Sequence, residues 1–152
     1  MKVYLDVCCL CRPFDDQNVN RIHLESEAVK EILLRCTHEW TLVVSDAVRY
    51  ELSRIPDKTR MRKALKFVEI AQEHIAITKT VSRRYRVFVD MGIDPADALH
   101  IACADAAGAV LLTTDDSIIK IIKRHPNQIS SGVYNPVEWL MEVNAHGGKD
   151  LE

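Results

Sequence analysis

The chain alternates short apolar runs with longer stretches in which apolar residues return every three or four positions. The short runs predict strands at residues 2–6, 41–44, 75–77, 110–113 and near 132–134. The longer stretches predict helices at residues 22–36, 58–73, 80–91, 95–107, 116–124 and 136–143, and one more that Ser45 or Asp46 caps and Pro56 ends. Residues 12–16 (RPFDD) predict an irregular turn after the first strand. Because strands alternate with helices, we expect a three-layer α/β/α sandwich around a central, mostly parallel sheet of about five strands.

Residues 92–102 (GIDPADALHIA) have the pattern of a helix start that presents a carboxylate. Asp94 suits the N-cap, and Pro95 suits the first helical position, where a missing N–H is harmless. This count places Asp97 in the first turn, where the helix N-terminus favours negative charge. The segment alone leaves two interpretations open, since Asp97 could support capping or face a site outside the helix.

Acidic residues also stand where predicted strands end. Asp6 closes the first strand, and Asp115 follows the strand at 110–113. The functional crevice of a parallel α/β sheet lies at the carboxyl ends of its strands, so we expect Asp6, Asp97 and Asp115 at one edge. Glu51, on the helix after the second strand, completes a set of four. Such a cluster repels itself unless protons or a hard cation offset the charge, and oxygen ligands favour Mg²⁺ or Mn²⁺ over zinc.

Length and composition favour one domain that folds without cross-links. The chain has 152 residues, 47% of them hydrophobic, and we expect a single domain at 1–145 with a flexible tail at 146–152. Five cysteines, three of them within residues 8–11, suit reduced thiols better than a disulfide framework. No run approaches the apolar length of a membrane span and no signal-peptide pattern is present, so we expect a cytoplasmic protein with no membrane partner.

Several competing interpretations have less support. A zinc site would use Cys8, Cys9, Cys11, Cys36 and His38. These residues lack the usual paired spacing, and adjacent cysteines on a strand point to opposite faces. His100, one turn after Asp97, is more typical of a packed histidine than of a ligand. A dinucleotide site would need a glycine-rich loop after the first strand, and a haloacid-type phosphatase would need Asp where Cys8 stands.

Four segments, taken together, resemble the motifs of the PIN domain family, and within it the VapC-like ribonuclease toxins and their relatives. They are residues 3–6 (VYLD), 45–52 (SDAVRYEL), 97–102 (DALHIA) and 112–115 (LTTD). Each motif alone is weak. Their order and approximate spacing match the family over nearly the whole chain.

The resemblance implies an endoribonuclease in which a Mg²⁺ or Mn²⁺ ion activates water to hydrolyse RNA phosphodiester bonds. Asp6, Asp97 and Asp115 resemble the metal ligands, and Glu51 resembles the acid that completes the site through water or orients the nucleophile. The chain departs from the family pattern after the first aspartate. Where a small hydroxyl residue, and often Asn, is usual, residues 7–9 read Val-Cys-Cys.

This departure keeps a second hypothesis open, a catalytically weak or inactive PIN-like module that binds RNA or protein. The resemblance also implies a homodimer and a small antitoxin protein as partner. Residues 49–66 carry seven basic and two acidic residues, a local charge of +5. This segment is typical of a solvated helix face, but in a ribonuclease it would, with Arg12, rim the site and attract phosphates.

Overall fold

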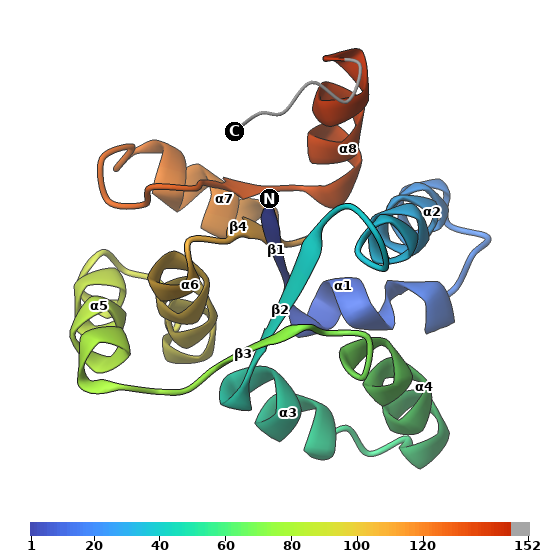
Figure 1. Ribbon diagram of the computed structural model, residues 1–152, viewed down its shortest axis with the longest axis horizontal. Helices are drawn as coiled ribbons and strands as arrows, with labels where there is room; N and C mark the ends of the chain where they lie inside the picture. The colour runs from blue at the N-terminus through green and yellow to red at the C-terminus, as the bar shows by residue number, and fades with distance from the viewer. Residues whose placement is uncertain (147–152) are drawn as a thin grey trace.

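Five parallel strands form the central sheet of the computed structural model, which describes residues 1–146. The strands are β1 (Lys2–Leu5), β2 (Thr41–Ser45), β3 (Glu73–Ile75), β4 (Val110–Leu112) and β5 (Val133–Tyr134), in the order β3-β2-β1-β4-β5. On β1, Val3 lies opposite Leu42 of β2 and Val110 of β4. The central strand is therefore paired on both sides, and the prediction of a parallel, five-stranded sheet is confirmed (Figure 1).

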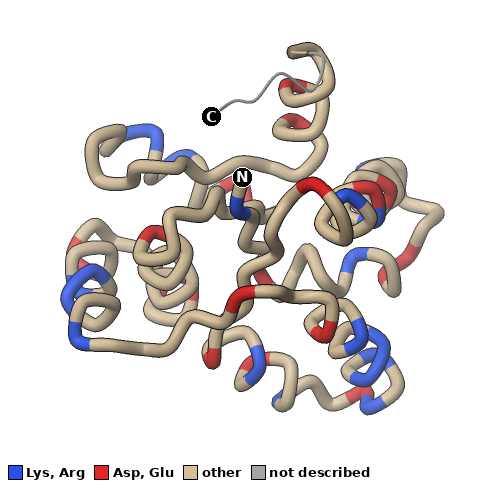
Figure 2. Tube along the Cα trace, viewed as in Figure 1, with Lys and Arg blue, Asp and Glu red and all other residues tan. Residues whose placement is uncertain are grey.

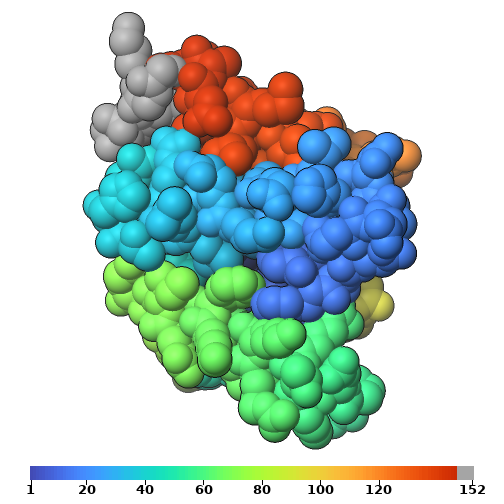
Figure 3. Space-filling view, turned by 90° about the vertical axis from the view of Figure 1, so that its right-hand side faces the viewer, coloured from blue at the N-terminus to red at the C-terminus, as the bar shows by residue number. Residues whose placement is uncertain are grey.

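Helices cover both faces of this sheet. They are α1 (Val7–Cys11), the 3-10 turn η1 (Arg12–Phe14), α2 (Asn20–Arg35), α3 (Asp46–Ser53), α4 (Lys58–Val68), α5 (Lys79–Asp90), α6 (Pro95–Ala107), α7 (Asp116–Lys123) and α8 (Pro136–Ala145). In Figure 1, α5, α6 and α7 lie on one side of the strands, and α1, α2, α4 and α8 lie on the other. Figure 3 shows the outer surface that α2, α4 and α8 form. The three-layer α/β/α arrangement is confirmed.

Side-chain caps begin the helices that border the carboxyl edge of the sheet. Asp6 caps α1, Ser45 caps α3, Asp94 caps α6 and Asp115 caps α7, each by accepting a backbone N–H. Gly108 ends α6 with a φ of 69°, a left-handed conformation that glycine adopts without strain. Asp6 directly follows β1, Ser45 is the last residue of β2 and Asp115 comes three residues after β4, so the local sequence sets where the chain turns from sheet to helix.

The core runs continuously from β1 to α8. Val3, Tyr4 and Leu112 are 0% exposed, and Val143 of α8 belongs to the same cluster. Within residues 1–146, no helix is both long and apolar enough to cross a membrane. All five cysteines carry free thiols, as the expectation of reduced cysteines requires. The single domain at 1–145 stays a prediction, and residues 147–152 of the expected tail lie outside the described part of the chain.

Three element boundaries differ from those expected. Residues 7–14 form α1 and η1 rather than leading into an irregular turn, because Asp6 accepts the Cys9 N–H and starts a helix at once. Strand β3 is two residues earlier than expected, because Gln72 pairs with Leu42 through both its backbone N–H and its side-chain oxygen. The expected helix at 58–73 ends as α4 at Val68, since the chain turns there toward β3.

Candidate active site

Asp6 lies where β1 ends and α1 begins, and it is the most buried of the four predicted acids. Its backbone N–H donates to the Leu112 carbonyl of β4 at 3.2 Å, and its Oδ1 accepts the Cys9 N–H at 3.1 Å and the Cys8 thiol at 2.6 Å. Burial, first of all, raises the pKa of the Asp6 carboxyl well above its usual value. The carboxyl is thus held rigidly, in surroundings that disfavour its charge unless a cation is near.

Cys8 lies beside Asp6, within the segment 7–9 that departs from the PIN motif. Its Sγ donates to Asp6, lies 3.7 Å from Thr113 Oγ1 and accepts the Thr114 N–H at 3.4 Å. A hydrogen bond with Cys9 is the largest influence that lowers the pKa of the Cys8 thiol, to about 6. Val7, in contrast, is buried in the core. The residue that supports Asp6 is therefore Cys8, on a helix rather than on the strand that sequence reasoning assumed.

Asp97 lies in the first turn of α6, and Asp115 caps α7. Burial, then the charges of Asp115 and Asp6, raise the pKa of Asp97 to about 6. Asp115 Oδ1 accepts from the Ser117 N–H at 2.9 Å and from the Ser117 hydroxyl at 2.6 Å. Because the charges of Asp6 and Asp115 are felt at Asp97, the fold brings these three carboxylates into one electrostatic cluster.

Glu51, on α3, lies beside His100 of α6. Glu51 Oε2 lies 3.6 Å from His100 Nε2, and His100 Nδ1 lies 2.8 Å from the Tyr4 hydroxyl. The prediction that His100 is packed in the core is confirmed, because the residue is 4% exposed. The ring is also hydrogen-bonded and faces a predicted catalytic acid, which its position in the sequence did not indicate.

The donor set fits a hard divalent cation better than a zinc ion. Among residues 1–146, the three potential ligand atoms that all lie within 4.8 Å of one another belong to Asp6, Cys8 and Cys9, not to the three aspartates. Cys9 is 0% exposed, and its thiol donates to the Leu112 carbonyl, so it is unsuited to binding an ion. Mg²⁺ commonly uses only one or two carboxylates and keeps several waters, so it does not require the ligand atoms of all three aspartates to be close together.

A buried ion-pair network supports the loop that carries Asp115. Arg21 donates to both oxygens of Asp116 at 2.8 Å and to the Thr114 carbonyl at 3.1 Å. Arg21 also pairs with Glu25, a residue only 1% exposed that sequence reasoning missed. The sequence signal for this residue was that Glu25 falls among the apolar positions of the predicted helix at 22–36. Asp116 is fully engaged by Arg21, which argues against an auxiliary role in metal binding.

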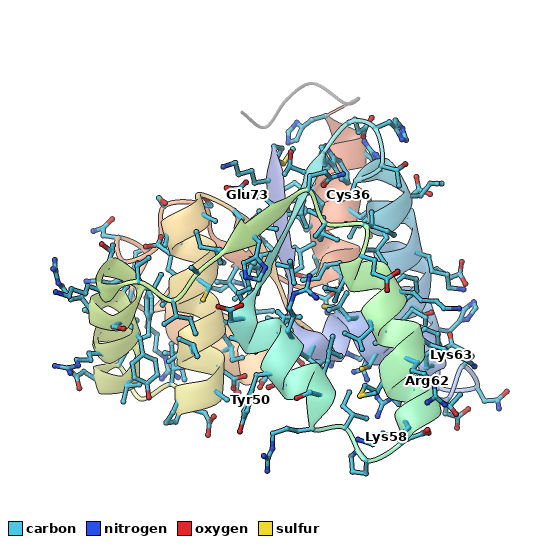
Figure 4. All side chains as sticks on the ribbon, turned by 60° about the horizontal axis from the view of Figure 1, so that its bottom comes forward. Cys36, Tyr50, Lys58, Arg62, Lys63 and Glu73 are labelled. Atoms are coloured by element: carbon cyan, nitrogen blue, oxygen red, sulfur yellow. The ribbon has the colours of Figure 1, made fainter. Side chains whose placement is uncertain are left out.

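The basic segment lies mostly on α4, where Figure 2 shows blue residues along the helix. The exposed bases on α4 are Lys58, Arg62, Lys63 and Lys66. None of them forms an ion pair within the described part of the chain. Arg60 instead pairs with Asp15 at 2.6 Å, and Arg12 pairs with Asp15 and Glu25. The expectation that Arg12 helps to rim the site stays a prediction, and its guanidinium is already paired with Asp15 and Glu25. In Figure 4, Tyr50 projects from α3 on the side toward α6, with Lys58 at the near end of α4.

Two large cavities lie apart from the four acids. One of about 460 Å³ is lined by residues that include Met1, Lys2 and Trp139, toward the amino ends of the strands. Another of about 430 Å³ lies over Arg21 and Asp116, between α2 and the start of α8.

The family profile of the PIN domain matches residues 3–124. No curated protein matches the chain significantly. Similar solved structures include VapBC2 from Rickettsia felis bound to a promoter DNA fragment, 19% identical over 89% of this chain and 98% of that one, with a TM-score of 0.58. FitAcB from Neisseria gonorrhoeae is 15% identical over 90% and 98%, with a TM-score of 0.60. VapBC-1 from nontypeable Haemophilus influenzae is 16% identical over 90% and 98%, with a TM-score of 0.58. At this level of identity the three structures establish a shared fold.

Proposed function

Since the chain belongs to the PIN domain family, whose members are generally nucleases, we propose that it is a metal-dependent endoribonuclease. One observation carries the proposal: burial, and after it the charges of Asp115 and Asp6, raises the pKa of Asp97 to about 6, as expected for acids gathered in one site. A fold that concentrates negative charge in this way gains most from a cation.

Asp6, Asp97 and Asp115 would hold a Mg²⁺ or Mn²⁺ ion. When bound, such an ion lowers the pKa of a water ligand and offsets charge on a phosphate. The chain's own residues would do the rest. Glu51 faces the cluster from α3 and would orient the attacking water or accept its proton, while the rigid caps at Asp6 and Asp115 keep the ligand oxygens in place.

Exposed bases on α4 would draw the RNA backbone toward an otherwise repulsive centre. Lys58, Arg62, Lys63 and Lys66 are exposed and are not neutralised by acids of the described residues. Each contact of a base with a phosphate releases counterions and strengthens binding at low salt. RNA affinity would thus come mainly from this helix, and cleavage from the acids.

A toxin–antitoxin role follows from the structural neighbours. VapBC2, FitAcB and VapBC-1 share the fold over 89–90% of this chain. By analogy, the partners of this protein would be a small antitoxin protein and a second copy of the chain, in the cytoplasm.

A catalytically weak or inactive PIN-like module that binds RNA or protein is the second candidate, and Cys8 favours it. The thiol donates to Oδ1 of Asp6 at 2.6 Å, one of the carboxylates that would hold the metal. Hydrogen bonds to a ligating carboxylate sustain metal affinity, and a thiol is a weaker donor than a hydroxyl. Such a protein would keep the fold and the basic helix but would turn over RNA slowly or not at all.

Cleavage of a fluorescent single-stranded RNA in Mg²⁺, Mn²⁺ or EDTA tests these alternatives. We expect cutting that depends on metal and is lost in Asp97→Asn. The matched control is Asp90→Asn, an equal change of charge at an exposed position of α5. Circular dichroism checks that both variants fold. Cutting that survives in Asp97→Asn, or in EDTA, refutes the proposal, whereas RNA binding without cutting supports the second candidate.

A further inference from the structure

Four polar side chains form a row that leads from the core to the edge of the candidate site. The Tyr4 hydroxyl lies 2.6 Å from Ser45 Oγ and 2.8 Å from His100 Nδ1. On the other side of the ring, His100 Nε2 lies 3.6 Å from Glu51 Oε2. Tyr4 and Ser45 are 0% exposed, whereas the Glu51 side chain is 41% exposed. The row is thus anchored in the core and ends at a carboxylate that solvent can reach.

Each buried member of the row stands on an element that carries one of the predicted acids. Tyr4 lies on β1, and Asp6 follows that strand directly as the N-cap of α1. His100 follows Asp97 by three residues on α6, which places them on one helix face. Ser45 caps α3, the helix of Glu51, by accepting the Val48 N–H at 3.2 Å. The row therefore ties together the elements of three acids.

The direction of the hydrogen bonds follows from counting protons. Ser45 Oγ already accepts the Val48 N–H, so it can give its own proton to Tyr4. Tyr4 has one proton, and giving it to His100 Nδ1 leaves the neutral ring protonated on Nε2. That proton then faces the Glu51 carboxylate. The opposite tautomer would aim a lone pair of Nε2 at the negative charge of Glu51, which electrostatics disfavours.

We propose that His100 is a positioning residue for Glu51. Its Nε2–H attracts the Glu51 carboxylate across 3.6 Å, and Tyr4 and Ser45 fix the tautomer and the orientation of the ring. The inference rests on the proposed function, because it assigns His100 to the reaction through Glu51. A purely structural row would serve only to satisfy buried polar atoms. This row instead ends at a half-exposed acid at the site, which burial alone does not require.

Tyr4→Phe tests the inference, because it removes only the hydroxyl and keeps the core filled. We expect kcat for RNA cleavage to fall about 10-fold, with KM for RNA unchanged, since misorientation of a catalytic group acts on the chemical step. Tyr85→Phe on α5 is the control, as its hydroxyl makes no hydrogen bond within residues 1–146. In a Glu51→Gln background, Tyr4→Phe should cost less than about 2-fold, because its effect passes through Glu51. An equal loss in both backgrounds overturns the inference.

His100→Gln and His100→Leu give a second comparison. Gln keeps an N–H that can reach Glu51, whereas Leu fills similar space without one. We expect Gln to retain at least about 5-fold more kcat than Leu, by the same orientation argument. Equal activity of two folded variants would show that the N–H toward Glu51 is unimportant.

A nitrogen NMR measurement separates failure of this inference from failure of the proposed function. Long-range ¹⁵N–¹H spectra of the full chain report which ring nitrogen of His100 carries the proton. We expect the Nε2–H tautomer, and a shift of the Nε2 signal in Glu51→Gln. If the wild-type protein does not cleave RNA, the proposed function fails and this spectrum alone decides whether His100 is poised on Glu51. An Nδ1–H tautomer, or no response to Glu51→Gln, overturns the inference.

Discussion

Glu25→Gln should destabilise the protein markedly, because Glu25 lies on the buried side of α2. The side chain is 1% exposed and accepts three hydrogen bonds. The donors are Arg12 Nε at 2.9 Å, Arg21 Nε at 3.2 Å and Asn135 Nδ2 at 2.7 Å. An uncharged amide of the same shape keeps the packing but loses the charge that two guanidinium groups face.

The expected loss can be worked out donor by donor. Arg21 is 51% exposed and keeps Asp116, so its share is small. Arg12 is 21% exposed and Asn135 is buried, so each loses a hydrogen bond to a charged acceptor, worth about 1.5–3 kcal/mol. Partial replacement by the amide oxygen leaves a net loss of about 2–4 kcal/mol, in line with the cost of breaking a buried ion pair. In a chain of this size that corresponds to a fall in Tm of about 4–16 °C.

Urea unfolding followed by circular dichroism, with a thermal scan beside it, measures the effect. Glu27→Gln is the control, because it changes the same charge on the exposed side of α2. We expect its midpoint to match that of the wild-type protein. A loss below about 0.5 kcal/mol for Glu25→Gln, the range of ordinary surface changes, would show that the network does not carry the stability assigned to it.

Further predictions concern the site and the basic helix. In EDTA the folded-state pKa of Asp97, about 6, lies above the unfolded value of 3.8, so stability should fall as pH rises from 4 to 6. The loss of folding free energy attributable to Asp97 is about 1–2 kcal/mol once solvent screening is allowed for. A pH series of urea midpoints should differ between the wild-type protein and Asp97→Asn in that window. Parallel curves would contradict the raised pKa of Asp97. Cys8→Ser should bind Mn²⁺ more tightly in calorimetry, by about 10-fold, because a hydroxyl supports a carboxylate and its water better than a thiol; weaker binding would show that sulfur is preferred. Reversing Lys58, Arg62 and Lys66 to Glu should weaken RNA binding and flatten its dependence on salt, and an unchanged slope would move the RNA path elsewhere.

The sequence was enough to predict the architecture because its signals are local. Caps at Ser45, Asp94 and Asp115, the glycine at Gly108 and the apolar runs each act within a few residues. A β–α–β alternation then leaves few arrangements besides a parallel sheet. The elements that carry the four acids followed from the same local pattern.

The boundaries that differed depend on side-chain hydrogen bonds, one between distant segments and one between neighbouring residues. Strand β3 begins where Gln72 meets Leu42, 30 residues away, rather than at the apolar run that follows. The short helix α1 forms because the side chain of Asp6 turns back to cap it, where an apolar run of cysteines had suggested a continued strand. Neither choice is visible in hydrophobic periodicity, which reports burial but not pairing partners.

The details of the site were decided by tertiary structure alone. Arg12 and Arg21 have the same charge in the sequence as the bases of α4, yet Glu25 and its neighbours use them inside the fold. His100 looked like a core residue, and only the approach of β1 and α3 to α6 places it between Tyr4 and Glu51. The sequence determines which residues can carry charge or donate a proton. Which of them are free to act depends on partners that lie close in space but far along the chain.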